Sequence, residues 1–194
     1  MSISAIILAA GQSKRMGQPK MLLPWESTTV LGKVIETLQY AGVVDILVVS
    51  GGAREEVERI AEKYNARVVH NEDFANSDML KSIQLGLQGQ KVQSEATLIC
   101  LGDQPQVEER SVQKVCVEFQ QHKSNIIVPS YQMRRGHPWL IARDLWDEVL
   151  QMHEPESMRD FLNSHKNDIF YVEHDSPNIL QDLDTPADYL KYKP

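Results

Sequence analysis

Runs of apolar residues that are typical of buried strands alternate with amphipathic helical segments along the whole chain. The run SAIIL at 4–8 is short, apolar and rich in isoleucine, as expected for a strand that is covered on both faces. In the segment 29–42, by contrast, apolar residues recur three and four positions apart, which is the spacing of one helix face. The same two patterns predict strands at 45–52, 66–71, 95–105, 124–131, 137–142 and 168–174, and helices at 54–64, 78–88, 108–122, 143–152, 155–165 and 184–193.

This alternation predicts β-α-β units and therefore an α/β fold, a three-layer αβα and Rossmann-like arrangement with a mostly parallel sheet. Within 131–175 the alternation is less regular, and we expect a small inserted region there with an antiparallel strand. The chain has 194 residues, so we expect a single domain over 1–194. Ligands of such sheets bind beyond the carboxyl ends of the parallel strands. The stretches 8–20 and 101–105 both follow strands, and we expect them at one rim.

The amino-acid composition disfavours several classes of binding partner. With 27 acidic and 20 basic residues the formal net charge is −7, which disfavours a nucleic-acid-binding protein because such proteins need a basic surface. No apolar run approaches the roughly 18 residues of a membrane-spanning helix, and the start MSISAIILAAG lacks the basic stretch of a secretory signal. Cys100 and Cys116 have neither metal-ligand nor redox spacing, so we expect free, buried thiols. We therefore expect a cytoplasmic protein without a membrane partner.

The stretch LAAGQSKRMGQPK at 8–20 combines small residues with cations directly after the first strand. It is neither a dinucleotide fingerprint, which needs G-x-G-x-x-G, nor a Walker A loop, which needs a lysine directly after its second glycine. The small residues 9–11 allow the backbone to approach a base or a phosphate, and N–H groups over 10–13 suit phosphate oxygens. Arg15 and Lys20 would add fixed positive charge. The residues suit a nucleoside-triphosphate loop of another type, and a solvated turn is the alternative.

The same stretch resembles the signature LAAGxSxRMGxxK of the nucleotidyltransferases that are similar to molybdenum cofactor cytidylyltransferase. Its matching residues are Leu8, Ala9, Ala10, Gly11, Ser13, Arg15, Met16, Gly17 and Lys20. Three further elements follow in the family's order, namely LGDQP at 101–105, RGHP at 135–138 and LDTPADY at 183–189. The resemblance spans 4–190 and implies the fold of the nucleotide-diphospho-sugar transferases. It also implies transfer of a nucleotidyl group from a triphosphate to a phosphate acceptor, with release of pyrophosphate.

The resemblance favours CTP as the nucleotide. The related guanylyltransferases usually have Leu-Ala-Gly-Gly in the first motif and Cys-Asp-x-Pro in the second, whereas this chain has Ala10 and the sequence Gly-Asp-Gln-Pro at 102–105. One departure lies in NEDFANSDMLKSIQLGL at 71–87, where Asp78 replaces the family's glycine before Met79. Because this segment is expected to contact the base, another triphosphate such as GTP remains an alternative to CTP as the substrate.

Transfer between two polyanions requires charge neutralisation and alignment. The resemblance implies that Asp103 and Asp184 bind Mg²⁺, which takes carboxylate, phosphate and water oxygens, with Asp182 as a rival to Asp184. Arg15 and Lys20 would hold the triphosphate, and together with Asp103 they form the expected catalytic set. The expected nucleotide contacts are Leu8, Ala9, Ala10, Gly11, Ser13, Arg15, Lys20, Asn71, Ser82 and Gly102.

On the acceptor side, the resemblance implies that Arg135 and His137 meet the terminal phosphate or the pterin of molybdopterin, although His137 could simply order the loop before Pro138. No protein nucleophile is needed, because the acceptor phosphate itself attacks the α-phosphorus. A molybdoenzyme or its chaperone is the protein partner that the resemblance suggests. Two alternatives stay open: a nucleotidyltransferase of the same fold with another acceptor, such as a sugar phosphate, and a non-catalytic nucleotide-binding module that delivers the cofactor.

Overall fold

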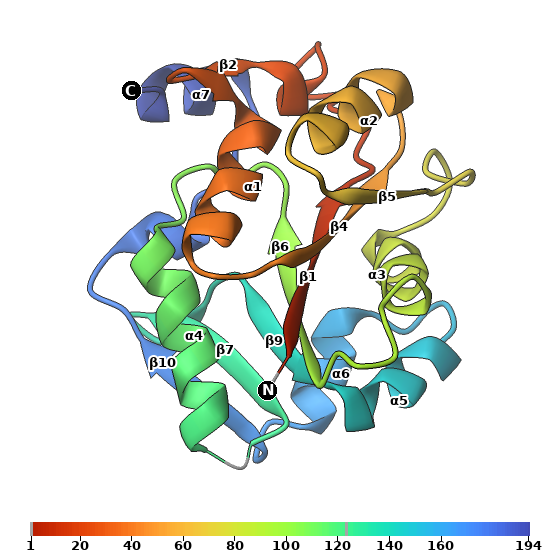
Figure 1. Ribbon diagram of the computed structural model, residues 1–194, viewed down its shortest axis with the longest axis vertical. Helices are drawn as coiled ribbons and strands as arrows, with labels where there is room; N and C mark the ends of the chain where they lie inside the picture. Colours follow the sequence, from red (N-terminus) through yellow and green to blue (C-terminus); the bar gives the residue numbers. More distant parts are fainter. Residues whose placement is uncertain (1, 123) are drawn as a thin grey trace.

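The computed structural model describes residues 2–122 and 124–194, and a mixed sheet of eight strands runs through this part of the chain (Figure 1). Its strands lie in the order β10 (Ile169–Glu173), β7 (Ile126–Tyr131), β9 (Trp139–Ala142), β6 (Ala96–Leu101), β1 (Ile3–Ala9), β4 (Asp45–Ser50) and β5 (Arg67–His70), with β8 (Arg134–Arg135) beside β7.

Most of the strands run parallel to one another. Strand β1 pairs in parallel with both β4 and β6, while β5 pairs in parallel with β4 and β10 with β7. Strand β9 is antiparallel to both of its neighbours, β6 and β7, and β8 is antiparallel to β7. The prediction of an α/β fold with a mostly parallel sheet and an inserted antiparallel strand is therefore confirmed.

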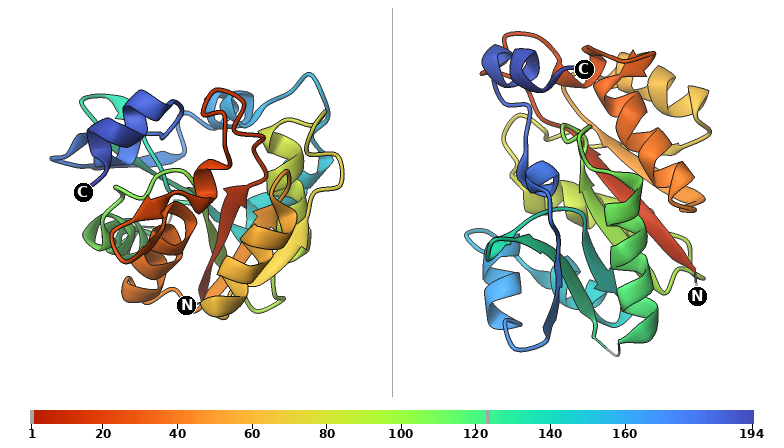
Figure 2. Two further views of the ribbon diagram at one scale, coloured as in Figure 1. Left: turned by 90° about the horizontal axis from the view of Figure 1, so that it is seen from above. Right: turned by 90° about the vertical axis from the view of Figure 1, so that its left-hand side faces the viewer.

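Helices cover both faces of the sheet, so that three layers are stacked (Figure 2). One core contains Ala5 and Ile7 of β1, and the other contains Ile6 and Leu8, as the alternation along a strand requires. The helices of the first face are α1 (Val30–Tyr40), α2 (Arg54–Lys63) and α4 (Glu109–Gln121), and those of the second are α3 (Met79–Gln88), α5 (Trp146–Gln151) and α6 (Met158–Ser164). The remaining elements are η1 (Lys20–Leu22), β2 (Pro24–Trp25), β3 (Thr28–Thr29), η2 (Arg143–Leu145), η3 (Pro177–Leu180) and α7 (Pro186–Tyr192).

The C-terminal helix α7 packs beside the hairpin of β2 and β3, away from the main sheet (Figure 1). Buried Leu183, Met16 and Trp25 belong to one apolar cluster, against which Tyr189 packs. The Tyr189 hydroxyl also donates to a backbone carbonyl of β2 at 2.6 Å. Thr185 caps α7 with its side chain. This cluster holds the segment before α7 next to the loop after β1, although the two are far apart in the sequence.

Two helices in the irregular region begin later than predicted. The helix expected over 155–165 starts at Met158, because Ser157 and Asp160 form a capping box there and leave Pro155 outside the helix. The helix expected over 143–152 starts as a 3-10 turn before α5. Both differences between prediction and structure concern the residue at which a helix begins. Local hydrogen bonds determine that residue.

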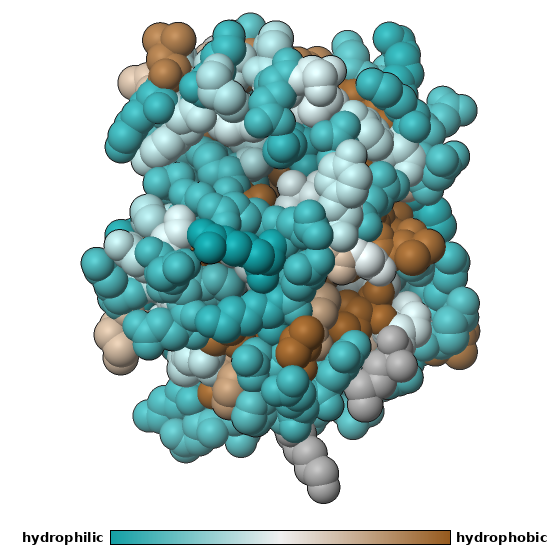
Figure 3. All heavy atoms as spheres, turned by 60° about the vertical axis from the view of Figure 1, so that its left-hand side comes forward, coloured by the Kyte–Doolittle hydropathy of each residue, from teal (hydrophilic) through white to brown (hydrophobic). Residues whose placement is uncertain are grey.

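The surface is mainly hydrophilic. On the face drawn in Figure 3, hydrophobic residues appear in separate patches among hydrophilic ones. Isolated exposed apolar residues such as Val44 and Leu190 are common on folded proteins. None of the helices in residues 2–122 and 124–194 combines the length and the apolar character that crossing a membrane requires.

Candidate active site

The loop after β1 and the turn after β6 meet at one edge of the sheet. Leu8 is paired with Leu101 near the ends of the two parallel strands, and the Gly102 N–H donates to the Leu8 carbonyl at 3.0 Å. A Cβ atom at Gly102 would lie 2.9 Å from that carbonyl oxygen, so the close approach requires glycine. Gly102 therefore shapes the rim with its backbone, and the stretches 8–20 and 101–105 lie together as expected.

Ser13 organises the loop that leads to Lys20. Its φ of 52° is left-handed, its carbonyl accepts from the N–H groups of Met16 and Gly17, and its Oγ accepts from the Lys20 N–H at 3.1 Å. Within the described part of the chain, the backbone N–H groups of 11–13 donate to no other group. These donors are available to an anionic ligand, whereas the Ser13 hydroxyl already has a partner.

The ammonium of Lys20 lies between two carboxylates that are distant in the sequence. Its Nζ contacts Asp103 and lies 3.3 Å from Oδ1 of Asp184, and Nη1 of Arg15 lies 2.9 Å from Oδ2 of Asp184. The side chains of Lys20 and Asp103 are 12% and 14% exposed, whereas that of Arg15 is 72% exposed. Burial by itself would lower the pKa of Lys20, but Asp103 and, next, Asp184 outweigh it, so the pKa is raised and the ammonium stays charged.

A third carboxylate, Asp182, lies beside this cluster. Gln104 Nε2 donates to Oδ1 of Asp182 at 2.6 Å, and the Leu183 N–H donates to the Asp103 carbonyl at 3.1 Å. These two bonds tie the segment before α7 to the turn after β6. Burial, followed by the charge of Asp103, raises the pKa of Asp182.

The donor set suits a hard divalent cation. A protein usually gives Mg²⁺ one or two carboxylates, and phosphates and water complete the shell. Asp103 and Asp184 fit this description, because both contact the same Lys20 ammonium. Among residues 2–122 and 124–194, no group of three or more His, Cys, Asp or Glu side chains is arranged to hold a metal ion. A metal held here would therefore depend on ligands from the bound nucleotide, and the assignment of Asp103 and Asp184 to it stays a prediction.

A cleft of about 270 Å³ opens next to this cluster. Its walls come from the loop after β1 and from the start of α3, and they include Leu8, Ala10, Gly11, Asp78, Met79 and Ser82. Lys20, Asp103 and Asp182 lie along its edge as well. The cleft thus places charged groups beside a surface of small and apolar residues.

Five expected nucleotide contacts do not line the cleft, namely Ala9, Ser13, Arg15, Asn71 and Gly102. Ala9 packs into the core on the opposite face of the sheet, because residues alternate along β1. Asn71 is 1% exposed, and its Nδ2 donates to Oγ of Ser77 and of Ser82 at 3.0 and 3.1 Å. Asn71 therefore positions Ser82 from behind. Asp78, the departure from the family pattern, accepts from the Lys81 N–H and caps α3.

A second pocket, of about 820 Å³, adjoins the cleft and shares Asp78 and Met79 with it. Both predicted acceptor residues line this pocket. Arg135 donates to Oη of Tyr171 and to Oδ1 of Asn163, each at 3.0 Å, so its guanidinium is held in place.

His137, the other predicted acceptor residue, is partly built into the fold. Its backbone N–H donates to the Ile179 carbonyl at 2.9 Å, and its ring stacks on Trp139 with ring centroids 4.2 Å apart. Its Nε2 is inaccessible and has no partner among the described residues, although the residue as a whole is partly exposed. Burial lowers the pKa of His137 to about 3, so the ring is neutral at physiological pH.

The sequence motifs did not single out three other residues of this pocket, Arg134, Trp139 and Arg159. Arg134 and Trp139 flank the RGHP motif, so their position next to that motif could have identified them as pocket residues. Arg159 comes from α6, where nothing in the local sequence marks a binding residue.

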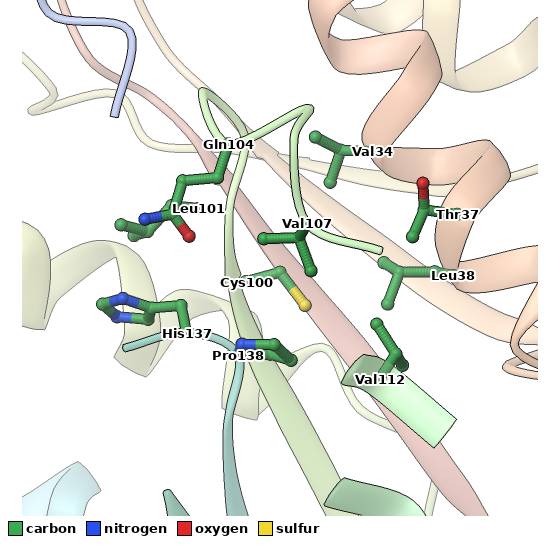
Figure 4. A pocket seen from close by; sticks show the side chains of 10 residues that line it. All are labelled: Val34, Thr37, Leu38, Cys100, Leu101, Gln104, Val107, Val112, His137 and Pro138. Carbon is green, nitrogen blue, oxygen red and sulfur yellow. The ribbon is translucent and has the colours of Figure 1, made fainter. Parts of the chain in front are cut away.

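A small cavity lies below the rim, between β6 and the helices α1 and α4 (Figure 4). Its volume of about 20 Å³ has room for about one water molecule and not for a substrate. Cys100 lines it, and burial raises the pKa of this thiol. Burial also raises the pKa of Cys116 to about 11. Both cysteines are free, as predicted, and neither is activated as a nucleophile.

Comparisons with known proteins identify the family of this chain. Residues 5–169 match the model of the MobA-like NTP transferase domain. The chain is 33% identical to a molybdenum cofactor cytidylyltransferase of Escherichia coli over 99% of this chain and 96% of that protein. It is 26% identical to a probable molybdenum cofactor guanylyltransferase of Bacillus cytotoxicus over 92% and 87% of the two chains.

A solved structure is also similar over nearly the whole chain. Rv0371c of Mycobacterium tuberculosis superposes with a TM-score of 0.84 at 28% identity, covering 98% of this chain and 96% of that one. A second structure of the same protein is a complex with manganese and gives a TM-score of 0.79 at 27% identity, covering 98% and 97%. With the family model matching residues 5–169, the chain therefore belongs to the family of MobA-like NTP transferase domains and is a nucleotidyltransferase.

Proposed function

We propose that this nucleotidyltransferase transfers CMP from CTP to the terminal phosphate of molybdopterin and releases pyrophosphate, in a reaction that depends on Mg²⁺. One observation carries the proposal: the charged Lys20, held by Asp103 and Asp184, lies at the edge of a cleft that adjoins an arginine-lined pocket. A cationic group at the phosphates and a separate pocket for an anionic acceptor are what such a transfer requires.

The triphosphate would lie along the loop after β1. The N–H groups of 11–13 would bind phosphate oxygens, and the ammonium of Lys20 and the guanidinium of Arg15 would neutralise the charge that develops on pyrophosphate as it leaves. Asp103 and Asp184 would hold the Mg²⁺, which when bound supplies further charge neutralisation at the phosphates. The acceptor phosphate attacks the α-phosphorus, so the P–O bond to pyrophosphate breaks as the new P–O bond forms.

The base would lie between the two walls of the cleft, near Ala10 and Ser82. Ala10 favours cytosine, because its methyl group takes space that a larger purine ring would need. Ser82 is held by Asn71 and can offer its hydroxyl to the base or the ribose. The similarity to a cytidylyltransferase at 33% identity supports CTP over GTP.

The test is pyrophosphate release from CTP and from GTP, each with Mg²⁺ and molybdopterin. We expect release with CTP and much slower release with GTP. Lys20→Ala should lower kcat/KM for CTP by about a thousandfold, the lower end of what one fixed cation contributes in phosphoryl transfer. Lys14→Ala is the matched control, because Lys14 is an exposed lysine of the same loop that does not line the cleft.

The other outcomes identify the alternatives. Preference for GTP would make the enzyme a guanylyltransferase. Release only with a sugar phosphate would change the acceptor. If CTP binds but releases no pyrophosphate with any acceptor, the protein is a nucleotide-binding module that delivers the cofactor. Full activity of Lys20→Ala would contradict the role of Lys20.

A further inference from the structure

Three arginines from two elements face the second pocket, and none of them has a carboxylate partner among the described residues. They are Arg134 and Arg135 of β8 and Arg159 of α6. Most other arginines of this acidic chain form ion pairs, as Arg67 does with Asp45. Guanidinium groups without partners, gathered at one concave surface, are typical of sites that bind anions.

The three arginines differ in how they are held. Arg135 is fixed by Tyr171 and Asn163, so part of its donor capacity is already used. Arg134 and Arg159 are exposed, and neither forms an ion pair or a side-chain hydrogen bond within the described residues. Their donors are therefore available to a ligand.

Their positions relative to the carboxylate cluster also differ. Arg134 lines the second pocket and also a groove that contains Asp182 and Asp184, so it lies on the side of the pocket next to the expected chemistry. Arg159 lines the pocket together with Met158 and Leu162 of the same helix and does not line that groove. The pocket therefore has a cation near the reacting end and another farther from it.

Two aromatic rings also line this pocket. Trp139 is 8% exposed, lines the pocket, and has an indole N–H without a partner among the described residues. The ring of His137 stacks on it and is neutral. Stacked aromatic rings suit a flat heterocycle.

We propose that this pocket recognises a planar heterocyclic acceptor at two anionic groups, with Arg134 at the phosphate that reacts and Arg159 at a second anionic group of the same acceptor. This inference rests on the proposed function for the direction of the reaction. It makes Arg159 a specificity residue, which contacts the acceptor and lies away from the transferred phosphorus. The molybdenum-bound dithiolene of a molybdopterin is a second anionic group of the kind required.

The test compares Arg159→Gln, Arg159→Lys and Arg134→Gln in steady-state kinetics with CTP and molybdopterin. Arg159→Gln should raise the KM for molybdopterin by about tenfold to a hundredfold, the cost of a lost charged hydrogen bond, with kcat and the KM for CTP nearly unchanged. Arg159→Lys should recover part of the loss. Arg134→Gln should lower kcat as well. Arg59→Gln, an exposed arginine of α2, is the control for loss of positive charge.

A binding measurement separates this inference from the proposed function. Titration of molybdopterin without CTP, followed by tryptophan fluorescence, should show binding to the wild type that Arg159→Gln weakens. If molybdopterin is a substrate and Arg159→Gln leaves its KM unchanged, the two-anion site is wrong and the proposed function stands. If no triphosphate reacts but binding depends on Arg159, the site stands and the proposed function is wrong. No binding and no reaction would contradict both.

Discussion

At the scale of single residues, His137 shows how burial decides what a titratable group can do. Its Nε2 is inaccessible and its pKa is about 3, so the folded protein does not take up a proton there between pH 7 and pH 4. In the unfolded chain a histidine has a pKa of about 6.5 and does take up the proton. The unfolded state therefore binds more protons in this window, and stability is lost as the pH falls from 6.5 toward 3.

We expect His137→Phe to remove this loss, because phenylalanine keeps an aromatic ring against Trp139 and cannot titrate. Between pH 7 and pH 5 the free energy of unfolding of the wild type should fall by about 2 kcal/mol more than that of the variant. Urea unfolding at the two pH values measures the difference, and the remaining histidines act as an internal control because both proteins contain them. Parallel pH curves for the two proteins would contradict the buried, neutral His137.

At the scale of elements, helix α7 matters because Asp184 directly precedes its cap. The Thr185 hydroxyl accepts from the Asp188 N–H and donates to the Asp188 carboxylate. We expect Thr185→Ala to lower the free energy of unfolding by about 1 kcal/mol, the usual loss for a cap. It should also raise the Mg²⁺ concentration for half-maximal activity, since a helix start without its cap holds the backbone of the preceding Asp184 less firmly. Thr185→Ser restores the oxygen and should restore both values, and an unchanged Mg²⁺ requirement in Thr185→Ala would contradict this coupling.

The sequence predicted elements better than it predicted their ends and contacts. The longer strands and helices have an apolar period of their own, so a local pattern is sufficient to recognise them, as in the buried run of β1, whereas the two-residue strands such as β8 have none. The predicted start of α6 is wrong because hydrogen bonds of the capping box at Ser157 and Asp160, and not the apolar pattern, decide where this helix begins. The contacts of Asn71 depend on the fold of the loop that follows it, and the spacing of apolar residues does not predict how that loop folds. Arg159 enters the pocket only through packing of α6, so the sequence carried no signal for it.

At the scale of the whole molecule, a net charge of −7 coexists with a pocket that is locally cationic. Arg134, Arg135 and Arg159 line the second pocket, whereas Lys20 at the cleft lies among the carboxylates of Asp103 and Asp182. An anionic acceptor would approach a molecule that repels it overall. The arginines of the pocket would attract it only at short range, because salt screens exposed charges over about 10 Å at 0.1 M.

We therefore expect the KM for the acceptor to rise as KCl increases from about 0.05 M to about 0.5 M, with a smaller change in kcat, because screening weakens capture by exposed charges more than it weakens contacts inside the pocket. Arg159→Gln should flatten the salt dependence of the KM for the acceptor and leave that for CTP intact, since Arg159 lines only the second pocket. Arg59→Gln changes the net charge equally from a distant helix and should leave both slopes unchanged. If the two arginine variants flatten the acceptor slope to the same degree, net charge governs capture and the pocket has no local effect.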